Sequence, residues 1–344
     1  MNTKYAPDHK KIQDQGPSFS LVIETENLGM AGLDDLRDTL DSLKAQNYPI
    51  TNAREVLIIA AGHISPETFK LIQTEYSWAT IHRIDEKLEY IQSKKRGAEI
   101  VTGDVVIFAD SDVVYEPTWL ENILYGFISA PGATIVTGET RIRKWNTSFY
   151  AHAIQLVWVM NMVSGSDHSV FVQHFHLNNF AIKRKVFLDT PHYLNLPIYR
   201  AHTVEMKKWL FDRGYAAVRV PHARGYHLPP GNLADWWWRM LVSGADAVVK
   251  ADFDFNYDGT VTQTFRPVKR ILRVPLFVGF KFWVMFKRVY VMLREDWKNI
   301  FMMMISIPLG LLFILVQLIG LIVAVVYRDY LFKGAAARES IHVV

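Results

Sequence analysis

The sequence has no cysteine among its 344 residues. Disulfide bonds and cysteine-based metal sites are therefore excluded, and the sequence carries no mark of an oxidising or a reducing compartment. Residues 1–20 lack an apolar run of signal-peptide length, so we expect the N-terminal domain to stay on the cytosolic side, where it is made. Internal repeats and low-complexity linkers are also missing. The N-terminal part contains no basic patch, so the sequence does not predict contact with nucleic acid.

Charge is absent from residues 301–327. A transmembrane helix needs about 20 consecutive apolar residues, so this run is long enough to cross a bilayer even when tilted. A buried helix of a soluble core is the alternative, and the length of the charge-free run disfavours it. We therefore predict one transmembrane helix at residues 299–328, followed by a C-terminal tail at 329–344.

The preceding region, residues 266–298, is equally apolar but is interrupted by basic residues. A charge in the middle of a bilayer is costly, so this region should not span. At 100° per residue the basic side chains fall within an arc of about 140°, which is typical of an amphipathic helix lying along anionic headgroups. A re-entrant or core helix is the alternative. The side chains in this arc are Arg270, Arg273, Lys281, Lys287, Arg288 and Arg294.

These basic residues precede the predicted span and favour a cytosolic N-terminal domain. Arg328, Lys333 and Arg338 follow the span and weaken that asymmetry. We expect a single-pass protein of the cell membrane with its N-terminal domain in the cytosol.

Apolar segments alternate with helical patterns after a polar N-terminal tail at residues 1–17. The expected strands are residues 19–24, 55–62, 79–85 and 104–109. Strands that alternate with helices predict a doubly wound α/β fold with a parallel sheet. From Thr134 the pattern is more mixed and completes the same sheet, so we place one domain at residues 18–265. Ligands bind such sheets at the carboxyl ends of the strands.

Asp110 and Asp112 follow the fourth strand directly, at the sheet edge where a ligand is expected. Two carboxylates one residue apart can share Mg²⁺ or Mn²⁺ with a diphosphate, and the metal then stabilises a departing nucleoside diphosphate. The alternative is an acidic turn before the next helix, which would need only one acid.

The segment at residues 94–124 resembles the corresponding segment of the family 2 glycosyltransferases. The matching residues are Lys94, Arg96, Gly97, Ala98, Gly103, Asp104, Asp110, Asp112, Pro117, Trp119 and Leu120. The resemblance extends over roughly residues 18–250. It implies a GT-A fold, which is a Rossmann-like mixed sheet, and transfer of a sugar from a nucleotide donor with inversion.

The resemblance implies that Asp110 contacts the ribose and that Asp110 and Asp112 both bind the metal. Glu24, Glu26 and Asn27 are candidate contacts to the nucleotide base, while Lys94 and Arg96 belong to the donor-binding segment. The family's acidic pair after the second strand is replaced by Ala60 and Ala61. The choice between a UDP-type and a GDP-type donor therefore stays open.

Two loop residues complete the predicted donor site. His227 is a candidate third ligand of the metal or the diphosphate, because a neutral imidazole can join two carboxylates on a cation. The alternative is a solvated histidine. Arg239 could neutralise the diphosphate with its planar guanidinium, or it could extend from an aromatic helix to the membrane surface.

The predicted base departs from the family pattern. His202 and Thr203 stand where the family usually has a Glu-Asp pair, and Glu205 follows. We rank Glu205 first and His202 second as the group that takes the proton from the acceptor hydroxyl. Glu205 could instead favour the start of a helix. An acceptor that is an ionised phosphate would need little help from a base.

The expected function is transfer of a sugar to a lipid-linked or other membrane-presented acceptor. Processive synthases of this family carry a Gln-x-x-Arg-Trp motif, of which only Arg239 is present here. A single transmembrane helix also forms no channel for a polymer, unless chains assemble into a homo-oligomer. We therefore expect non-processive transfer. Two alternatives stay open: a phosphatase of the haloacid dehalogenase type, whose motif also has Asp-x-Asp after a strand, and a nucleotide-sugar-binding scaffold without turnover.

Overall fold

The computed structural model describes residues 7–25, 33–61, 65–84, 88, 90–143, 153, 166, 168–191, 201–227, 233–249, 253–255, 261–263, 267–295 and 297–327. The chain divides into two compact units. The first unit comprises Met1–Arg141, Met160–Thr190 and Leu210–Leu228, and the second comprises Ile142–Val159, Pro191–Trp209 and Pro229–Val344.

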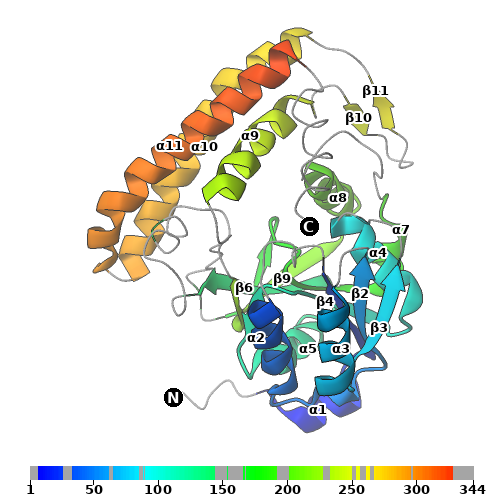
Figure 1. The fold of residues 1–344 in the computed structure, drawn as a ribbon. Coiled ribbons are helices and arrows are strands. Elements are labelled where there is room, and N and C mark those ends of the chain that lie inside the picture. Colours follow the sequence, from blue (N-terminus) through cyan, green and yellow to red (C-terminus); the bar gives the residue numbers. More distant parts are fainter. Residues whose placement is uncertain are drawn as a thin grey trace. The chain divides into compact units, whose positions relative to one another are not determined.

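The first unit is built on one mixed sheet (Figure 1). Its strands are β1 (Phe19–Glu24), β2 (Val56–Ala61), β3 (Thr80–Ile84), β4 (Val105–Asp110), β5 (Val113–Tyr115), β6 (Ala133–Ile142), β7 (Val170–Val172), β8 (Asn179–Lys183) and β9 (Ala216–His227). They follow the order β3-β2-β1-β4-β8-β6-β9-β5, and β7 also pairs with β9.

The strand directions divide this sheet into two halves. β3, β2, β1 and β4 are parallel, whereas β8 is antiparallel to β4 and β5 is antiparallel to β9. The four strands expected from the sequence are therefore confirmed as the parallel half. β4 is the last parallel strand, and its six residues are all buried.

Helices cover the sheet of the first unit. They are α1 (His9–Gln15), α2 (Leu33–Lys44), the short 3₁₀ helix η3 (Ile50–Asn52), α3 (Pro66–Glu75), α4 (Tyr90–Ile100), α5 (Trp119–Ser129) and α7 (Arg184–Asp189). Leu36, Leu40 and Leu43 of α2 are fully buried in one core with Leu21 of β1 and Ile107 of β4. α4 packs on β1, β2 and α7, and none of its residues belongs to that core.

α3 shows how local sequence sets a helix boundary. Ser65 accepts a hydrogen bond from the Thr68 backbone N–H, and Pro66 occupies the first helical position, where its missing N–H leaves no bond unmade. The helix accordingly begins at Pro66.

The second unit contains most of α8 (Ala201–Asp212), with α9 (Leu233–Val249), β10 (Phe253–Phe255), β11 (Val261–Gln263), α10 (Pro267–Glu295) and α11 (Asn299–Val326). β10 and β11 form an antiparallel pair. Among the described residues, one helix, α11, is long and apolar enough to cross a membrane, with a mean hydropathy of 3.0. It coincides with the span expected at residues 299–328.

α10 and α11 form an antiparallel hairpin (Figure 1). At the turn the Asn299 side chain donates to the Met292 carbonyl at 2.9 Å. At the other end Val274 and Phe277 of α10 pack on the buried cluster that holds Leu321 and Ala324 of α11. The helix predicted within residues 266–298 is confirmed as α10, while its placement along the headgroups stays a prediction.

α9 packs closely on α11. The Trp236 ring stacks on Phe313 with ring centroids 5.6 Å apart. A Cβ added to Gly320 would lie 2.0 Å from the Leu241 carbonyl oxygen, and one added to Gly244 would lie 1.8 Å from that of Gln317. The two helix backbones therefore meet at glycines, because no larger residue leaves room for this approach.

Candidate functional site

Asp110 is the last residue of β4, between parallel β1 and antiparallel β8. Its partner in the register with β1 is Glu24, and both carboxylates are buried. Ligand sites of open α/β sheets lie where the strand order reverses, at the carboxyl ends of the strands. The structure thus places Asp110 and the predicted base contact Glu24 side by side at that edge.

Two side chains of α4 hold the Asp110 carboxylate. Lys94 Nζ donates to Oδ1 at 2.6 Å, and the Tyr90 hydroxyl donates to Oδ2 at 2.9 Å. Lys94 is 0% exposed, and its ammonium lies 4.4 Å from the centroid of the Tyr90 ring. A buried lysine and a buried aspartate so close compensate each other's charge. Direct contact of Lys94 with the donor stays a prediction, since its ammonium lies on Asp110.

Tyr115 braces the turn that contains the acidic pair. Its hydroxyl accepts from the Asp110 backbone N–H at 3.1 Å and donates to the Asn178 carbonyl at 3.0 Å. Burial raises the pKa of this hydroxyl well above its usual value, and the Asp110 charge raises it further. The Tyr115 ring also lies 4.1 Å from the Trp119 ring, centroid to centroid. The hydroxyl therefore stays protonated and ties the end of β4 to the residue before β8.

Asp112 lies beside His227, and the sequence predicts both, together with Asp110, as ligands of one metal. His227 Nε2 is 3.5 Å from Asp112 Oδ2, and both side chains are largely buried. His227 ends β9 and is paired in register with Val113 of β5. A carboxylate and an imidazole at this separation are suited to share a divalent cation.

Among the described residues, no group of three or more histidines and acids gathers as a metal cage. Both Asp110 oxygens already accept hydrogen bonds from Tyr90 or Lys94. Mg²⁺ is often held by one or two carboxylates together with substrate phosphates and water, so a two-residue set fits a metal that arrives with a diphosphate. The residues present fit the predicted Mg²⁺ or Mn²⁺ best through Asp112 and His227.

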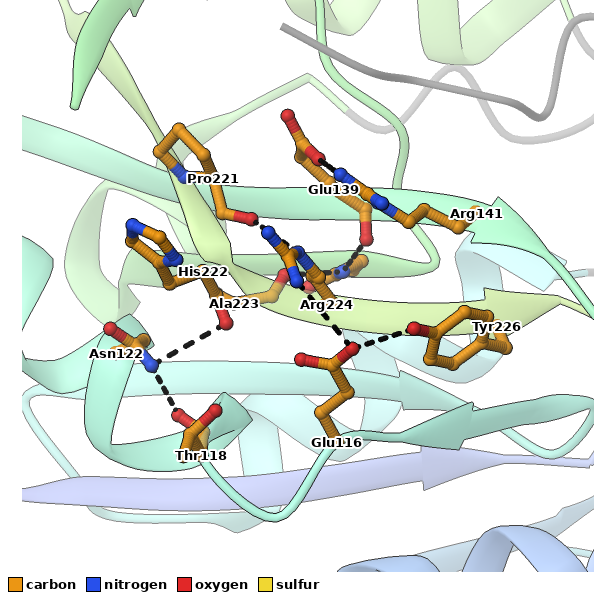
Figure 2. A network of polar contacts seen from close by, with 11 residues as sticks. Glu116, Thr118, Asn122, Glu139, Arg141, Pro221, His222, Ala223, Arg224 and Tyr226 are labelled. Atoms are coloured by element: carbon orange, nitrogen blue, oxygen red, sulfur yellow. Dashed lines mark hydrogen bonds and ion pairs between the residues drawn. The ribbon is translucent and has the colours of Figure 1, made fainter. Parts of the chain in front are cut away.

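A polar network links Glu116, directly after β5, to Arg224 and Tyr226 of β9 (Figure 2). The Tyr226 hydroxyl donates to Glu116 at 2.6 Å, and Arg224 lies 3.9 Å from the same carboxylate. The Glu116 backbone N–H donates to the Arg224 carbonyl at 3.0 Å. Burial and the bond to Glu116 raise the pKa of Tyr226 to about 12, so its hydroxyl remains a donor at neutral pH.

The remaining predicted contacts of the first unit lie away from this pair or outside the described residues. Arg96 is half exposed and pairs with Glu99 on the surface of α4 at 3.3 Å. Glu26 and Asn27 lie outside the described residues. The donor-binding role of Arg96 stays a prediction.

The predicted bases and Arg239 belong to the second unit. His202 and Glu205 lie on α8, where the Glu205 side chain is buried, and Arg239 lies on partly buried α9. Lys207 is a buried titratable group of α8 that the sequence patterns did not reveal. Its burial lowers the pKa to about 8. Lys207 is thus a third candidate on this helix, beside the predicted bases Glu205 and His202.

Sequence reasoning also missed Tyr90 and Tyr115. Tyr90 stands four residues before Lys94, a spacing that places both on one helix face, and this was the available signal. For Tyr115 no spacing gives a signal, because its contact follows from the fold of the β4–β5 turn.

The mixed sheet with an acidic pair after its last parallel strand defines the GT-A class of folds. The sequence profile described as "Glycosyl transferase family 2" matches residues 20–194, half of the chain. The chain belongs to glycosyl transferase family 2, which confirms the resemblance seen at residues 94–124.

Two solved structures share the fold. The mannosyltransferase PcManGT from Pyrobaculum calidifontis, in complex with GDP-Man and Mn²⁺, is 15% identical with a TM-score of 0.56, over 95% of this chain and 90% of that one. GalNAc-T7 with UDP, GalNAc and Mn²⁺ is 14% identical with a TM-score of 0.50, over 70% of this chain and 51% of that one. At these identities the likeness establishes the GT-A fold.

A curated relative is the glucosyl-dolichyl phosphate glucuronosyltransferase of Haloferax volcanii. It is 27% identical over 170 residues, which are 48% of this chain and 52% of the relative. The chain thus matches about half the length of this curated relative.

Proposed function

We propose that this protein is a membrane-attached glycosyltransferase that moves a sugar from a nucleoside-diphosphate sugar to a lipid-linked acceptor. The observation that carries the proposal is the pair formed by Asp112 and His227. It lies close in sequence to Asp110, which is paired with Lys94 at the point where the strand order of the sheet reverses. Membership of the family supports the reaction class.

In this proposal Asp112 and His227 hold Mg²⁺ or Mn²⁺. Bound there, the metal would offset the negative charge that develops on the departing nucleoside diphosphate. Asp110 and Glu24 face the nucleoside, and Arg239 contributes positive charge to the diphosphate. The solved relatives, crystallised with Mn²⁺ and either GDP-Man or UDP, support a nucleotide donor and a divalent metal.

The acceptor in this proposal is carried by a lipid, and transfer is inverting and non-processive. The name of the Haloferax relative gives a glycosylated dolichyl phosphate, which supports a lipid-linked acceptor here. Glu205, or else His202, takes the proton from an acceptor hydroxyl. α11 attaches the protein to the cell membrane, with the first unit in the cytosol.

The decisive variant is Asp112→Ala. We expect it to abolish metal-dependent transfer and to weaken metal-dependent donor binding. Asp34→Ala is the matched control, because the Asp34 side chain is 95% exposed on α2. The assay screens nucleotide sugars with a membrane lipid extract, and it measures both nucleoside diphosphate release and sugar in the lipid phase.

Full transfer by the Asp112→Ala protein would overturn the proposal. Metal-dependent donor binding without release of nucleoside diphosphate, under every sugar and lipid tested, would indicate a scaffold. Release of orthophosphate from simple phosphate esters would indicate a phosphatase instead.

A further inference from the structure

A stripe of exposed apolar side chains runs along α10. The spacing of three and four residues keeps the stripe on one helix face. It extends over 22 residue steps, or about 33 Å at 1.5 Å per residue, close to the roughly 30 Å of a bilayer's hydrocarbon core. Its members are at least 57% exposed: Val268, Leu272, Leu276, Phe280, Trp283, Phe286 and Tyr290.

Several basic side chains of α10 are less exposed than this stripe. Arg273, Lys281 and Arg288 are half-buried, whereas the apolar side chains are the exposed ones. A helix on a water-exposed surface shows the reverse arrangement, with its charged face outward. Lys287 and Arg294 are exposed, and the Lys287 ammonium lies 5.2 Å from the centroid of the exposed Trp283 ring. The outward face of α10 is therefore suited to lipid chains rather than to water.

α11 has an exposed apolar stripe of its own. Its exposed side chains also follow one helix face over the full length: Phe301, Met304, Leu311, Leu315, Ile319, Ile322 and Val326. The hairpin contacts extend from Met292 and Asn299 at the turn to Phe277 and Leu321 near the open end. Two helices paired along their length have nearly the same tilt in a bilayer. If α11 crosses, α10 crosses with it.

We infer that α10 and α11 cross the bilayer together as a hairpin, with lipid acyl chains against both exposed stripes. This inference deepens the membrane attachment in the proposed function and rests on it. The connection between α10 and α11 then lies on the far side of the membrane from the first unit. Tyr327, at the end of α11, lies on the same side as the first unit. The chain has two crossings, instead of one crossing and a helix along the headgroups.

The distribution of basic residues favours this topology. Lysine and arginine in short segments beside a span concentrate on the cytosolic side. In the hairpin the two cytosolic flanks carry Arg266, Lys269, Arg270, Arg273, Arg328, Lys333 and Arg338. The far flank, counted over a matching stretch of α10, carries Arg288, Arg294 and Lys298. A single crossing would instead divide the basic flanks between the two sides.

Lys281 is the main energetic cost, because it stands fourteen residues from each end of α10. A cation near the centre of a spanning helix is costly, and the apolar residues of the stripe offset part of that cost. Lys281 is also half-buried, with its ammonium 5.1 Å from the Phe277 ring centroid. Arg288 is seven residues from Glu295, about 10 Å, so its long side chain can extend toward the far surface.

Single cysteines test the topology directly, because the chain contains no cysteine of its own. Lys44→Cys reports the first unit, Lys298→Cys the turn and Tyr327→Cys the end of α11. Each full-length variant is made in sealed membrane vesicles of known sidedness and labelled with a membrane-impermeant maleimide. Detergent-opened vesicles give the total labelling. Leu276→Cys, in the middle of the stripe, is expected to stay unlabelled from either side.

The hairpin predicts that the cysteines at 44 and 327 are labelled from one side and the cysteine at 298 from the other. Labelling of 44 and 298 from one side and 327 from the other would overturn it in favour of a single crossing. Labelling of all three from the same side would overturn it in favour of a hairpin that does not cross. Sugar transfer by the same vesicles is measured separately, so an overturned topology with intact transfer leaves the proposed function standing.

Discussion

At the scale of single residues, Asp110 and Asp112 have different neighbours. Asp110 is compensated by Lys94 and bonded by Tyr90, whereas Asp112 lies beside His227. The two aspartates of one short motif are thus in different electrostatic surroundings. Asp110 is fixed before any ligand arrives, and Asp112 is the carboxylate suited to a cation.

The Lys94–Asp110 pair gives a stability prediction. Asp110→Asn leaves a buried ammonium without its counter-charge, and Lys94→Met leaves a buried carboxylate, so each should cost about 3–5 kcal/mol. The double variant removes both charges and should recover much of that loss. The apparent midpoint of thermal unfolding of the detergent-solubilised full chain measures the effect.

The surface pair of the same helix is the control for this cycle. Arg96 and Glu99 are 51% and 41% exposed, so Arg96→Met and Glu99→Gln should each change stability by about 1 kcal/mol or less. If the stability losses of the two single variants simply added in the Lys94/Asp110 double variant, the predicted charge compensation between the two residues would be contradicted.

A short motif and a family pattern were sufficient to mark Asp110, Asp112 and His227 as candidate site residues, and the structure places Asp112 beside His227. The sequence was not sufficient for the partners of Asp110. The Tyr115 hydroxyl reaches the Asp110 N–H only through the path of the β4–β5 turn, and such a path leaves no periodic trace in the sequence.

At the scale of elements, the contact of α9 with α11 depends on two glycines. Gly320→Ala would place a Cβ 2.0 Å from a backbone oxygen of Leu241, so the helices must separate. We expect a loss of about 1–3 kcal/mol, as for other overpacked contacts. The apparent thermal midpoint in detergent checks this.

Gly279→Ala is the matched control on α10, where nothing lies within 4 Å of the added Cβ. Alanine is favoured over glycine in a helix by about 1 kcal/mol, so this variant should be neutral or slightly stabilising. An equal effect of the two substitutions would show that the close approach of α9 and α11 is not important for stability.

Elements with a strong pattern were predictable. β4 is a continuous apolar run, and α11 is a long charge-free run, so both followed from composition alone. The pairing of α10 with α11 did not follow, since the basic residues of α10 suggested a face for headgroups. In the structure Arg273, Lys281 and Arg288 are half-buried. A helical wheel cannot show which face of a helix packs on a neighbour.

At the scale of the whole molecule, the exposed stripes of α10 and α11 predict integral attachment to membranes. The protein should remain in the membrane pellet after washing with alkaline carbonate and should enter the supernatant with detergent. A peripheral membrane protein in the same sample, which carbonate releases, is the control. Release of this chain by carbonate would contradict insertion of the hairpin.

The β5–β9 pairing also bears on how the first unit folds. It joins Asp112 to His227 across 115 residues of chain, and β9 is the last strand of the sheet to be synthesised. Closing a loop of that length costs about 4 kcal/mol of chain entropy by the logarithmic rule. Long-range pairings of this kind slow folding. A divalent ion shared by Asp112 and His227 would then act as a reversible cross-link, which delays unfolding of a strand pair that is slow to form.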